Sequence, residues 1–324
     1  METTTWSIPT TPTRDKRAVL AELRGASKRF GTGAATVDAV RDVDLTIRSG
    51  ELLAVLGPNG AGKTTAIAML TGLTRPSTGT ATLFGRDPRD LDARRRIGVM
   101  LQASGVPETL RVRELLAEFR AYYPAPLSMA QIVEAAGLDG LERRLFGDLS
   151  GGQQRRVLFG IALAGDPELV FFDEPTTGLD VEIRRSLWST LRGLTASGRG
   201  VVLTTHYLEE ADALADRIVV IDHGRVTAEG TPTEIKSLVP GRRIRAESTV
   251  SVGEAERFEG VQRATRDGTW IELLVGSAEP ALRALLGADP TLTNVTVVEP
   301  TLEEAFLALT ARRTRPTTES EAAA

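Results

Sequence analysis

The feature that most constrains the fold of this chain is residues 57–64, which read Gly-Pro-Asn-Gly-Ala-Gly-Lys-Thr. They match the G-x-x-x-x-G-K-[ST] pattern of a phosphate-binding loop at every fixed position. The loop follows an all-apolar run at residues 52–56, typical of a buried parallel strand, and residues 64–73 have the pattern of a helix. Glycines let backbone N–H groups approach phosphate oxygens, and a helix N-terminus adds partial positive charge. The strand, loop and helix together predict an α/β nucleotide-binding fold.

Two side chains of this loop carry the expected chemistry. In such a loop Lys63 reaches the β- and γ-phosphates, and the Thr64 hydroxyl ligates Mg²⁺. The alternative is a glycine-rich turn that carries Lys-Thr by accident. The flanking strand and helix argue against that alternative.

A second motif ends in two carboxylates. Residues 169–172 are apolar and lead into Asp173 and Glu174. Asp173 is expected at the strand end beside the Mg²⁺ shell, and Glu174 is expected to face the attacking water. Alone, an acidic pair at a strand end is more often a solvated cap. The phosphate loop upstream favours the functional interpretation.

A third motif, Leu-Ser-Gly-Gly-Gln at residues 149–153, opens a helix that is expected to run to about Ala164. Ser150 and the amides of Gly151 and Gly152 form another anion site at a helix N-terminus. An ordinary N-capped helix after a glycine turn is the structural interpretation of the same residues. The two interpretations are compatible.

These motifs resemble the ATP-binding cassette of ABC transporters, and the resemblance covers about residues 18–240. Residues 57–64 match the family's Walker A, residues 149–153 its signature, and residues 169–174 its Walker B with the catalytic carboxylate. The fold implied is a P-loop NTPase cassette with a mostly parallel core sheet, an antiparallel β-subdomain and a helical subdomain.

The resemblance also assigns single residues. It places Gln102 in the Q-loop, Asp180 in the D-loop and His206 at the switch histidine. Phe30 takes the place of the usual adenine-stacking Tyr, which preserves stacking but not a hydroxyl contact. The implied catalytic residues are Glu174, His206 and Gln102, and the implied ligands of Mg²⁺ are Thr64, Gln102 and Asp173. The implied contacts to ATP are Phe30, Gly57, Pro58, Asn59, Gly60, Ala61, Gly62, Lys63, Thr64, Thr65, Ser150, Gly151, Gly152, Gln153 and Asp180.

Composition limits the partners and the cellular compartment that this chain can have. The 39 basic and 43 acidic residues, with a pI near 5.5, give no general attraction to nucleic acid, and we expect no such partner. The chain has no Cys, which suits a reducing compartment. No run approaches the roughly eighteen apolar residues that span a bilayer. Residues 1–16, rich in Thr and Pro, are expected to be disordered and to be neither a signal peptide nor an anchor.

Within the predicted cassette, residues 17–240, two patterns mark subdomains. Val43, Leu45 and Ile47 alternate with polar residues, as in a half-buried strand of the β-subdomain. Between Gln102 and Ser150 the pattern is helical; Leu115, Leu116 and Phe119 share one face, and Ile132, Ala135 and Ala136 share another. The family uses such an insert to contact a permease loop, whereas the alternative is that these faces form the insert's own core.

A second domain is expected at residues 241–310. The order strand, helix, hairpin, helix, strand, helix predicts a ferredoxin-like α+β module. Asp267 and Gly268 form its hairpin signal, and Thr301 begins a capping box. Leu282, Leu285 and Leu286 are expected to share one helical face. Residues 311–324 have the composition of a disordered tail.

The ending Glu-Pro-Thr-Leu-Glu-Glu-Ala-Phe, residues 299–306, resembles the C-terminal extension of drug- and antibiotic-exporting cassettes of the ABC-2 type. We therefore expect the ATPase subunit of such an exporter, peripheral at the cytoplasmic face of a bacterial plasma membrane. The expected substrate of the exporter is a drug, an antibiotic or a lipid-like molecule, which would cross the membrane through a separate permease subunit.

A partner cassette is also expected. The resemblance implies that the signature of one cassette faces the γ-phosphate held by a second cassette. The chain has one phosphate loop and one signature, so a second copy or a paralogue is expected to complete each ATP site in a homodimer or heterodimer. An importer ATPase is the nearer alternative, and only the C-terminal module argues against it. The second alternative is a soluble ABC ATPase that acts on ribosomes or DNA. Translation factors of that kind carry two cassettes on one chain, and repair ATPases insert a long coiled coil between phosphate loop and signature. This sequence has neither feature.

Overall fold

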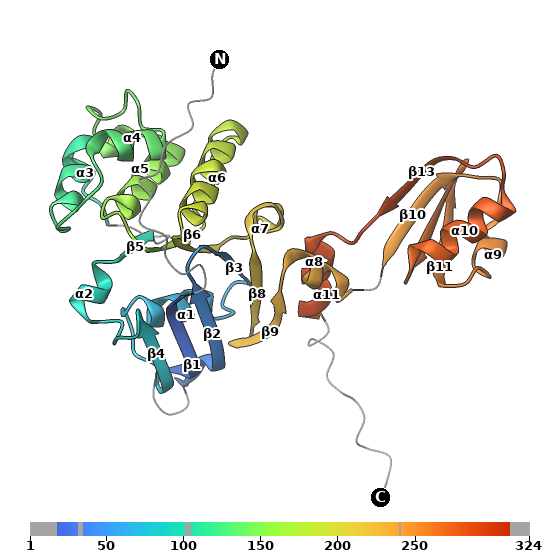
Figure 1. The fold of residues 1–324 in the computed structure, drawn as a ribbon, viewed down its shortest axis with the longest axis horizontal. Helices are drawn as coiled ribbons and strands as arrows, with labels where there is room; N and C mark the ends of the chain where they lie inside the picture. Colours follow the sequence, from blue (N-terminus) through green and yellow to red (C-terminus); the bar gives the residue numbers. More distant parts are fainter. Residues whose placement is uncertain (1–17, 32–34, 101–104, 240, 312–324) are drawn as a thin grey trace, which may run out of the picture. The chain divides into compact units, whose positions relative to one another are not determined.

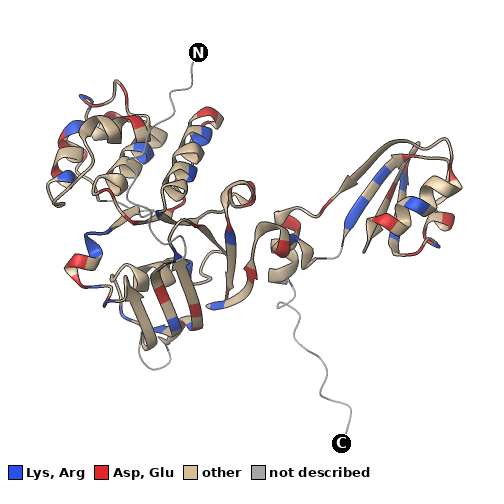
Figure 2. Cartoon of the chain, viewed as in Figure 1, with Lys and Arg blue, Asp and Glu red and all other residues tan. Residues whose placement is uncertain are grey.

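The structure, a computed structural model, describes residues 18–31, 35–100, 105–239 and 241–311. It divides into two compact units, Met1–Thr231 and Pro232–Ala324 (Figure 1). Gln102 lies outside the described residues. The two terminal segments predicted to be disordered, residues 1–16 and 311–324, also lie outside them, except for residue 311, which ends the last helix. Lys and Arg are interspersed with Asp and Glu along both units, in keeping with the near balance of charge (Figure 2).

A six-stranded sheet forms the centre of the first unit, with strand order β5-β6-β7-β3-β8-β9. Its strands are β3 (Leu52–Leu56), β5 (Ile97–Met100), β6 (Leu169–Asp173), β7 (Gly200–Thr204), β8 (Arg217–Asp222) and β9 (Arg225–Gly230). Neighbouring strands pair in parallel, except that β9 runs antiparallel to β8. Every residue of β3, β6 and β7 is buried, which explains why these strands are nearly continuous apolar runs. The predicted parallel core sheet is confirmed.

A three-stranded antiparallel sheet, β2-β1-β4, forms the β-subdomain. Its strands are β1 (Val19–Phe30), β2 (Val37–Arg48) and β4 (Thr78–Leu83). Val43, Leu45 and Ile47 are buried while the residues between them are not, so the predicted alternation is confirmed. These three side chains join the hydrophobic cluster that also contains residues of β3 and helix α1 (Lys63–Leu70).

The helical insert consists of α3 (Val112–Arg120), α4 (Met129–Ala136), the 3₁₀ turn η2 (Phe146–Asp148) and α5 (Gly151–Leu163). Leu115, Leu116, Ile132, Ala135 and Ala136 are all buried, and Phe119 packs against the same cluster. That cluster continues into the central sheet and into α6 (Val181–Ala196). Most of the insert's apolar side chains therefore form its own core, which is the alternative interpretation given in the sequence analysis.

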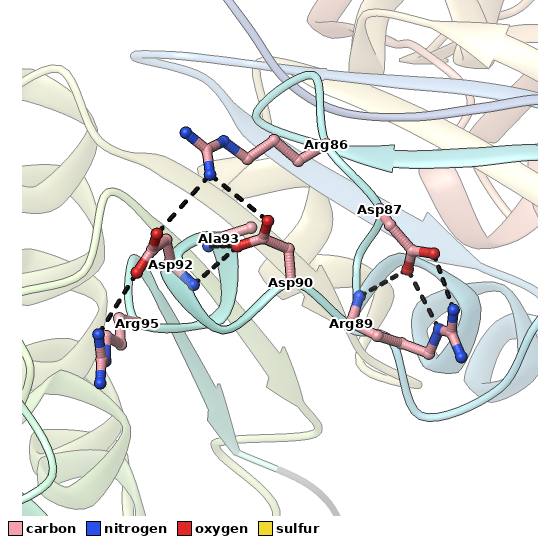
Figure 3. Close-up of polar contacts among 7 residues, drawn as sticks. All are labelled: Arg86, Asp87, Arg89, Asp90, Asp92, Ala93 and Arg95. Carbon is pink, nitrogen blue, oxygen red and sulfur yellow. Dashed lines mark hydrogen bonds and ion pairs between the residues drawn. The ribbon is translucent and has the colours of Figure 1, made fainter.

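The short helix α2 (Leu91–Arg94) lies in the segment between β4 and β5, where side chains of opposite charge alternate (Figure 3). Asp90 caps the helix by accepting hydrogen bonds from the amides of Asp92 and Ala93, at 2.8 and 3.2 Å. Arg86 pairs with Asp90 at 3.4 Å and Arg95 pairs with Asp92 at 3.3 Å. These pairs are largely exposed, and we interpret them as solvated surface charges rather than a site.

The second unit contains a four-stranded antiparallel sheet with strand order β11-β12-β10-β13. Its elements are β10 (Arg242–Glu247), α9 (Val252–Ala255), β11 (Val261–Asp267), β12 (Trp270–Val275), α10 (Ala278–Ala288) and β13 (Thr293–Val298). The βαββαβ order is the one predicted, and Asp267 and Gly268 lie at the β11–β12 hairpin as expected.

Two details of this unit differ from the sequence prediction. Helix α8 (Pro232–Ser237) packs with α11 (Leu302–Ala311), so the compact unit begins at Pro232 rather than after residue 240. On α10, Leu285 is buried and Leu282 packs against the module's core, but Leu286 is 50% exposed. The face that meets the sheet is completed by the small residues Ala278 and Ala281, and this turns Leu286 outward.

Candidate active site

The predicted phosphate loop connects β3 to α1, and its glycines allow close backbone approach. A Cβ on Gly57 would lie 2.1 Å from the carbonyl oxygen of Ile221, and one on Gly62 would lie 2.3 Å from that of Ala39. Gly62 also has φ of 105° and is the N-cap of α1, where no side chain caps the first-turn amides. These amides can therefore hydrogen-bond an anion at the helix N-terminus.

Lys63 places a cation against this loop. Its Nζ donates to the carbonyl oxygens of Gly57 and Pro58, at 2.6 and 3.0 Å. Burial lowers the pKa of Lys63, and the nearby charges of Asp173 and Glu174 act in the opposite direction. A partly desolvated ammonium beside amides at a helix N-terminus fits the phosphates of a nucleotide.

Asp173 ends strand β6, is only 9% exposed, and accepts a hydrogen bond from the Thr204 hydroxyl of the neighbouring strand. The Thr64 hydroxyl, at the start of α1, is on an exposed residue. Among the described residues no three His, Cys, Asp or Glu side chains cluster into a metal cage. Mg²⁺ in phosphate sites is bound by one or two protein oxygens with phosphates and water, so this donor set fits such an ion.

Glu174 has an unusual backbone, with a φ of 51° in the left-handed region. Its N–H donates to the carbonyl oxygen of Thr204 at 3.0 Å, and its own carbonyl oxygen accepts from Arg155 of α5 at 2.9 Å. Its carboxylate accepts from the Thr177 hydroxyl at 3.3 Å and lies 3.2 Å from Nδ1 of His206. A carboxylate fixed in this way can polarise and deprotonate water.

His206 follows strand β7, and its side chain is 52% exposed. The structure thus joins the predicted residues Lys63, Asp173, Glu174 and His206 in one cluster. The contacts of Arg155, Thr177 and Thr204 to this cluster were not predicted. The contacts of Arg155 and Thr204 depend on packing between distant segments, and the local sequence carries no signal for them. Thr177 is only three residues from Glu174.

The predicted signature opens α5 as expected. Ser150 is the N-cap; its Oγ accepts from the amide of Gln153 at 3.3 Å, and Gln153 Oε1 accepts from the Ser150 amide at 3.1 Å. This capping box leaves Ser150 and Gly151 exposed at the helix N-terminus. A Cβ on Gly152 would lie 3.2 Å from Leu179, so the signature helix starts against the segment that leads to α6.

Two other predicted residues lie at element ends. Asp180 is the N-cap of α6 and accepts from the amide of Ile183 at 2.9 Å. Phe30 ends β1, is 46% exposed, and has Nζ of Lys28 5.1 Å from its ring centroid. An exposed aromatic ring is available for stacking. The predicted Gln102 lies outside the described residues.

A glycine-rich loop, its lysine and a strand-end carboxylate pair define a P-loop nucleotide hydrolase. Residues 40–177 match the ABC transporter family. The chain is 39% identical to the daunorubicin/doxorubicin resistance ATP-binding protein DrrA of Streptomyces peucetius, over 84% of this chain and 88% of that protein. The chain belongs to the ABC transporter family as an ATP-hydrolysing cassette, and the family predicted from the motifs is confirmed.

Other relatives and solved structures agree. The chain is 38% identical to the daunorubicin resistance ATP-binding protein DrrA2 of Streptomyces coeruleorubidus, over 95% of this chain and 100% of that protein. It is 41% identical to the Nod factor export ATP-binding protein I of Burkholderia lata, over 65% of this chain and 70% of that protein. A solved ATP-binding cassette, a dimeric post-hydrolysis state bound to ADP and Pi, matches 65% of this chain and 98% of its own, with 26% identity and a TM-score of 0.61.

A further solved structure, an ATP-binding subunit of an ABC transporter, matches 68% of this chain and 92% of its own, with 28% identity and a TM-score of 0.61. These likenesses confirm the predicted cassette fold. None of the helices among the described residues combines the length and the apolarity that a membrane crossing requires.

Proposed function

We propose that this chain powers an ABC-2-type exporter, as one of two cassettes attached to a separate permease. The observation that carries the proposal is the extent of the likeness to the daunorubicin resistance protein DrrA2, which spans 95% of this chain and all of that protein. The likeness therefore includes the C-terminal module as well as the cassette. A drug, an antibiotic or a lipid-like molecule is the proposed substrate.

The geometry of the cluster and the matches to the family's motifs support the proposed site roles. Lys63 and the loop amides, from Gly57 to Thr65, hold the β- and γ-phosphates, and Phe30 stacks on the adenine. Thr64 and Asp173 hold Mg²⁺, with Gln102 as a further ligand. When bound, this ion supplies charge neutralisation at the phosphates.

Glu174 is the proposed general base. Its carboxylate lies 3.2 Å from Nδ1 of His206, and the Thr177 hydroxyl fixes its second oxygen. His206 is proposed to orient this carboxylate and to contact the γ-phosphate. The two side chains are 21% and 52% exposed, so water can reach them.

The proposed ATP site is shared between two cassettes. Ser150, Gly151, Gly152 and Gln153 lie at the N-terminus of α5, and the first-turn amides there suit the γ-phosphate held by a partner. Asp180 caps α6 at the segment beside the signature helix. The dimeric cassettes among the matching structures support this arrangement.

The proposed permease contact lies between the core sheet and the helical insert. A cavity of about 240 Å³ opens there, lined by Thr71, Leu73, Arg94, Ile97, Val99, Phe119, Tyr123, Ile161 and Ala162. Leu73 is 56% exposed and the neighbouring Tyr122 is 64% exposed. A largely apolar cleft with exposed apolar side chains beside it suits a short helix of a membrane partner. This contact would hold the chain at the cytoplasmic face of a bacterial plasma membrane.

Transport by the reconstituted complex tests this function. The chain is purified with the permease that associates with it and placed in vesicles with Mg-ATP supplied on the cassette side. We expect ATP-dependent movement of an anthracycline away from the cassette side, and no movement with Glu174→Gln. Movement of solute toward the cassette side would instead identify an importer.

A further inference from the structure

Glu210, on helix α7 (Leu208–Leu214), is a carboxylate with no exposed surface. Its Oε1 accepts from the indole Nε1 of Trp188 at 3.0 Å, and its Oε2 accepts from the Thr176 hydroxyl at 3.1 Å. The Thr205 hydroxyl is a third hydrogen-bond partner. Burial raises the pKa of Glu210, and the hydrogen bonds act in the opposite direction.

The three partners come from three segments, and each segment carries a residue of the proposed site. Thr176 lies in the loop just after Glu174, and Thr205 immediately precedes His206. Trp188 belongs to α6, the helix that Asp180 caps. One buried carboxyl group therefore connects the segments of the general base, the switch histidine and the D-loop.

A second contact links the same segments. The guanidinium of Arg184, also on α6, lies 5.0 Å from the ring centroid of Tyr207, the residue after His206. Arg184 also donates to the carbonyl oxygen of Leu179 at 3.5 Å and is near enough to Glu210 to interact with its charge. A rotation of α6 would therefore be transmitted to the His206 segment by two routes.

Packing alone does not account for an acid at this position. A buried carboxyl group carries a desolvation cost that an apolar side chain of similar volume avoids. A position near a helix N-terminus favours an acid, but Glu209 occupies the same turn of α7 and is exposed. What distinguishes Glu210 is its three hydrogen-bond partners on separate segments.

We propose that Glu210 is a positioning residue for ATP hydrolysis, which holds the Glu174 loop and the His206 segment in register with α6. The inference rests on the roles proposed above for Glu174 and His206. It predicts that loss of these hydrogen bonds slows the chemical step and leaves nucleotide binding intact, because neither Glu210 nor its partners belongs to the phosphate loop.

The test uses the full chain with Mg-ATP and compares Glu210→Gln with Glu209→Gln, a matched control on the exposed side of the same turn. We expect Glu210→Gln to lower kcat by roughly tenfold or more, since small displacements of reacting groups have effects of this size. KM for ATP and the affinity for a non-hydrolysable ATP analogue should change by less than about twofold. Glu209→Gln should match the unaltered chain in all three.

A second pair of variants covers the case in which Glu210→Gln does not fold. Thr176→Val keeps the side-chain shape but removes the hydroxyl donor, whereas Thr176→Ser keeps the donor. The positioning role predicts that Val lowers kcat at unchanged KM and that Ser restores it. Equal kcat for the Val and Ser variants, or an unchanged kcat in a folded Glu210→Gln, would overturn the inference.

Glu174→Gln in the same assays separates this inference from the proposed function. If Glu174→Gln abolishes hydrolysis while Glu210→Gln does not slow it, only the positioning role fails. If Glu174→Gln hydrolyses ATP at the unaltered rate, the proposed general base is wrong, and the inference fails with it.

Discussion

Arg155 donates a hydrogen bond of 2.9 Å to the backbone carbonyl of Glu174, and so ties the signature helix to a residue with a φ of 51°. A left-handed backbone at a non-glycine residue costs about 1–3 kcal/mol and persists only where surrounding contacts determine it. The second such contact is the hydrogen bond from the Glu174 amide to the carbonyl of Thr204. The orientation of the Glu174 carboxylate therefore depends on the position of α5 as well as on that of strand β7.

Arg155→Met should accordingly slow hydrolysis more than it weakens ATP binding. The substitution keeps the apolar stem and removes the donor, which should lower stability by about 1 kcal/mol and kcat by roughly tenfold. Arg156→Met is the matched control, because Arg156 donates to the carbonyl of Gly137 within the helical insert instead. Steady-state kinetics and thermal unfolding of both variants check this prediction. Equal kcat values for Arg155→Met and Arg156→Met would contradict it.

Lys63→Ala and Glu174→Gln should separate in behaviour. Lys63→Ala removes the cation that contacts the phosphate loop, so both ATP binding and hydrolysis should be lost. Glu174→Gln keeps the side-chain shape but is a far weaker base, so ATP affinity should remain while turnover falls by about a hundredfold or more. Nucleotide titrations beside turnover assays give the comparison. Near-normal steady-state hydrolysis by Glu174→Gln would refute its assigned role.

Dimerisation of the cassettes should depend on ATP, because in the shared site the nucleotide bridges Lys63 of one copy and Ser150 of the other. Glu174→Gln should accumulate the closed pair in Mg-ATP, and Ser150→Arg should prevent both pairing and hydrolysis by placing a bulky cation at the helix N-terminus. Light scattering with and without Mg-ATP measures the pairing. Full hydrolysis by Ser150→Arg would rule out the shared site.

The sequence predicted those parts of the molecule that local patterns determine. The phosphate loop, the apolar strand before Asp173 and the Ser150 capping box each lie within a few residues of the chain, and the structure has all three. The βαββαβ order of the C-terminal module follows from the same kind of pattern.

What the sequence did not predict depends on contacts between distant segments. The left-handed Glu174 is held by Thr204 and Arg155, and Glu210 is held by a hydroxyl 34 residues away. The outward turn of Leu286 was missed for a related reason, since Ala278 and Ala281 complete, beside Leu285, the face of α10 that packs on the sheet. The hydrophobic periodicity of a sequence does not indicate which distant residues come into contact.

The C-terminal module should lose stability in acid. Asp289 is only 2% exposed, and hydrogen bonds from the Thr291 hydroxyl, the Thr249 amide and the Ser248 hydroxyl hold its pKa well below the ordinary range. Its folded-state pKa is depressed, so the stabilisation is present above the unfolded-state pKa of about 4 and is lost as the pH falls below it. Hydrogen exchange of residues 242–298 between pH 3 and 6 should show this loss, with a flatter dependence in Asp289→Asn.

Removal of the C-terminal unit should preserve the ATP site and impair coupling between cassettes. We expect a cleaner result from a chain that ends at Thr231 than from one that ends near Leu238, because α8 packs with α11 and Ile235 is buried. A cut after Leu238 would keep α8 without α11 and would expose the Ile235 side chain. The chain ending at Thr231 should bind ATP normally, since Lys63, Asp173, Glu174 and His206 all precede the cut, but its closed dimer should be shorter-lived and transport with the permease lower. Dimer dissociation rates in Glu174→Gln with and without the module measure this directly. Unchanged dimer lifetime, hydrolysis and transport would leave the module with no part in coupling.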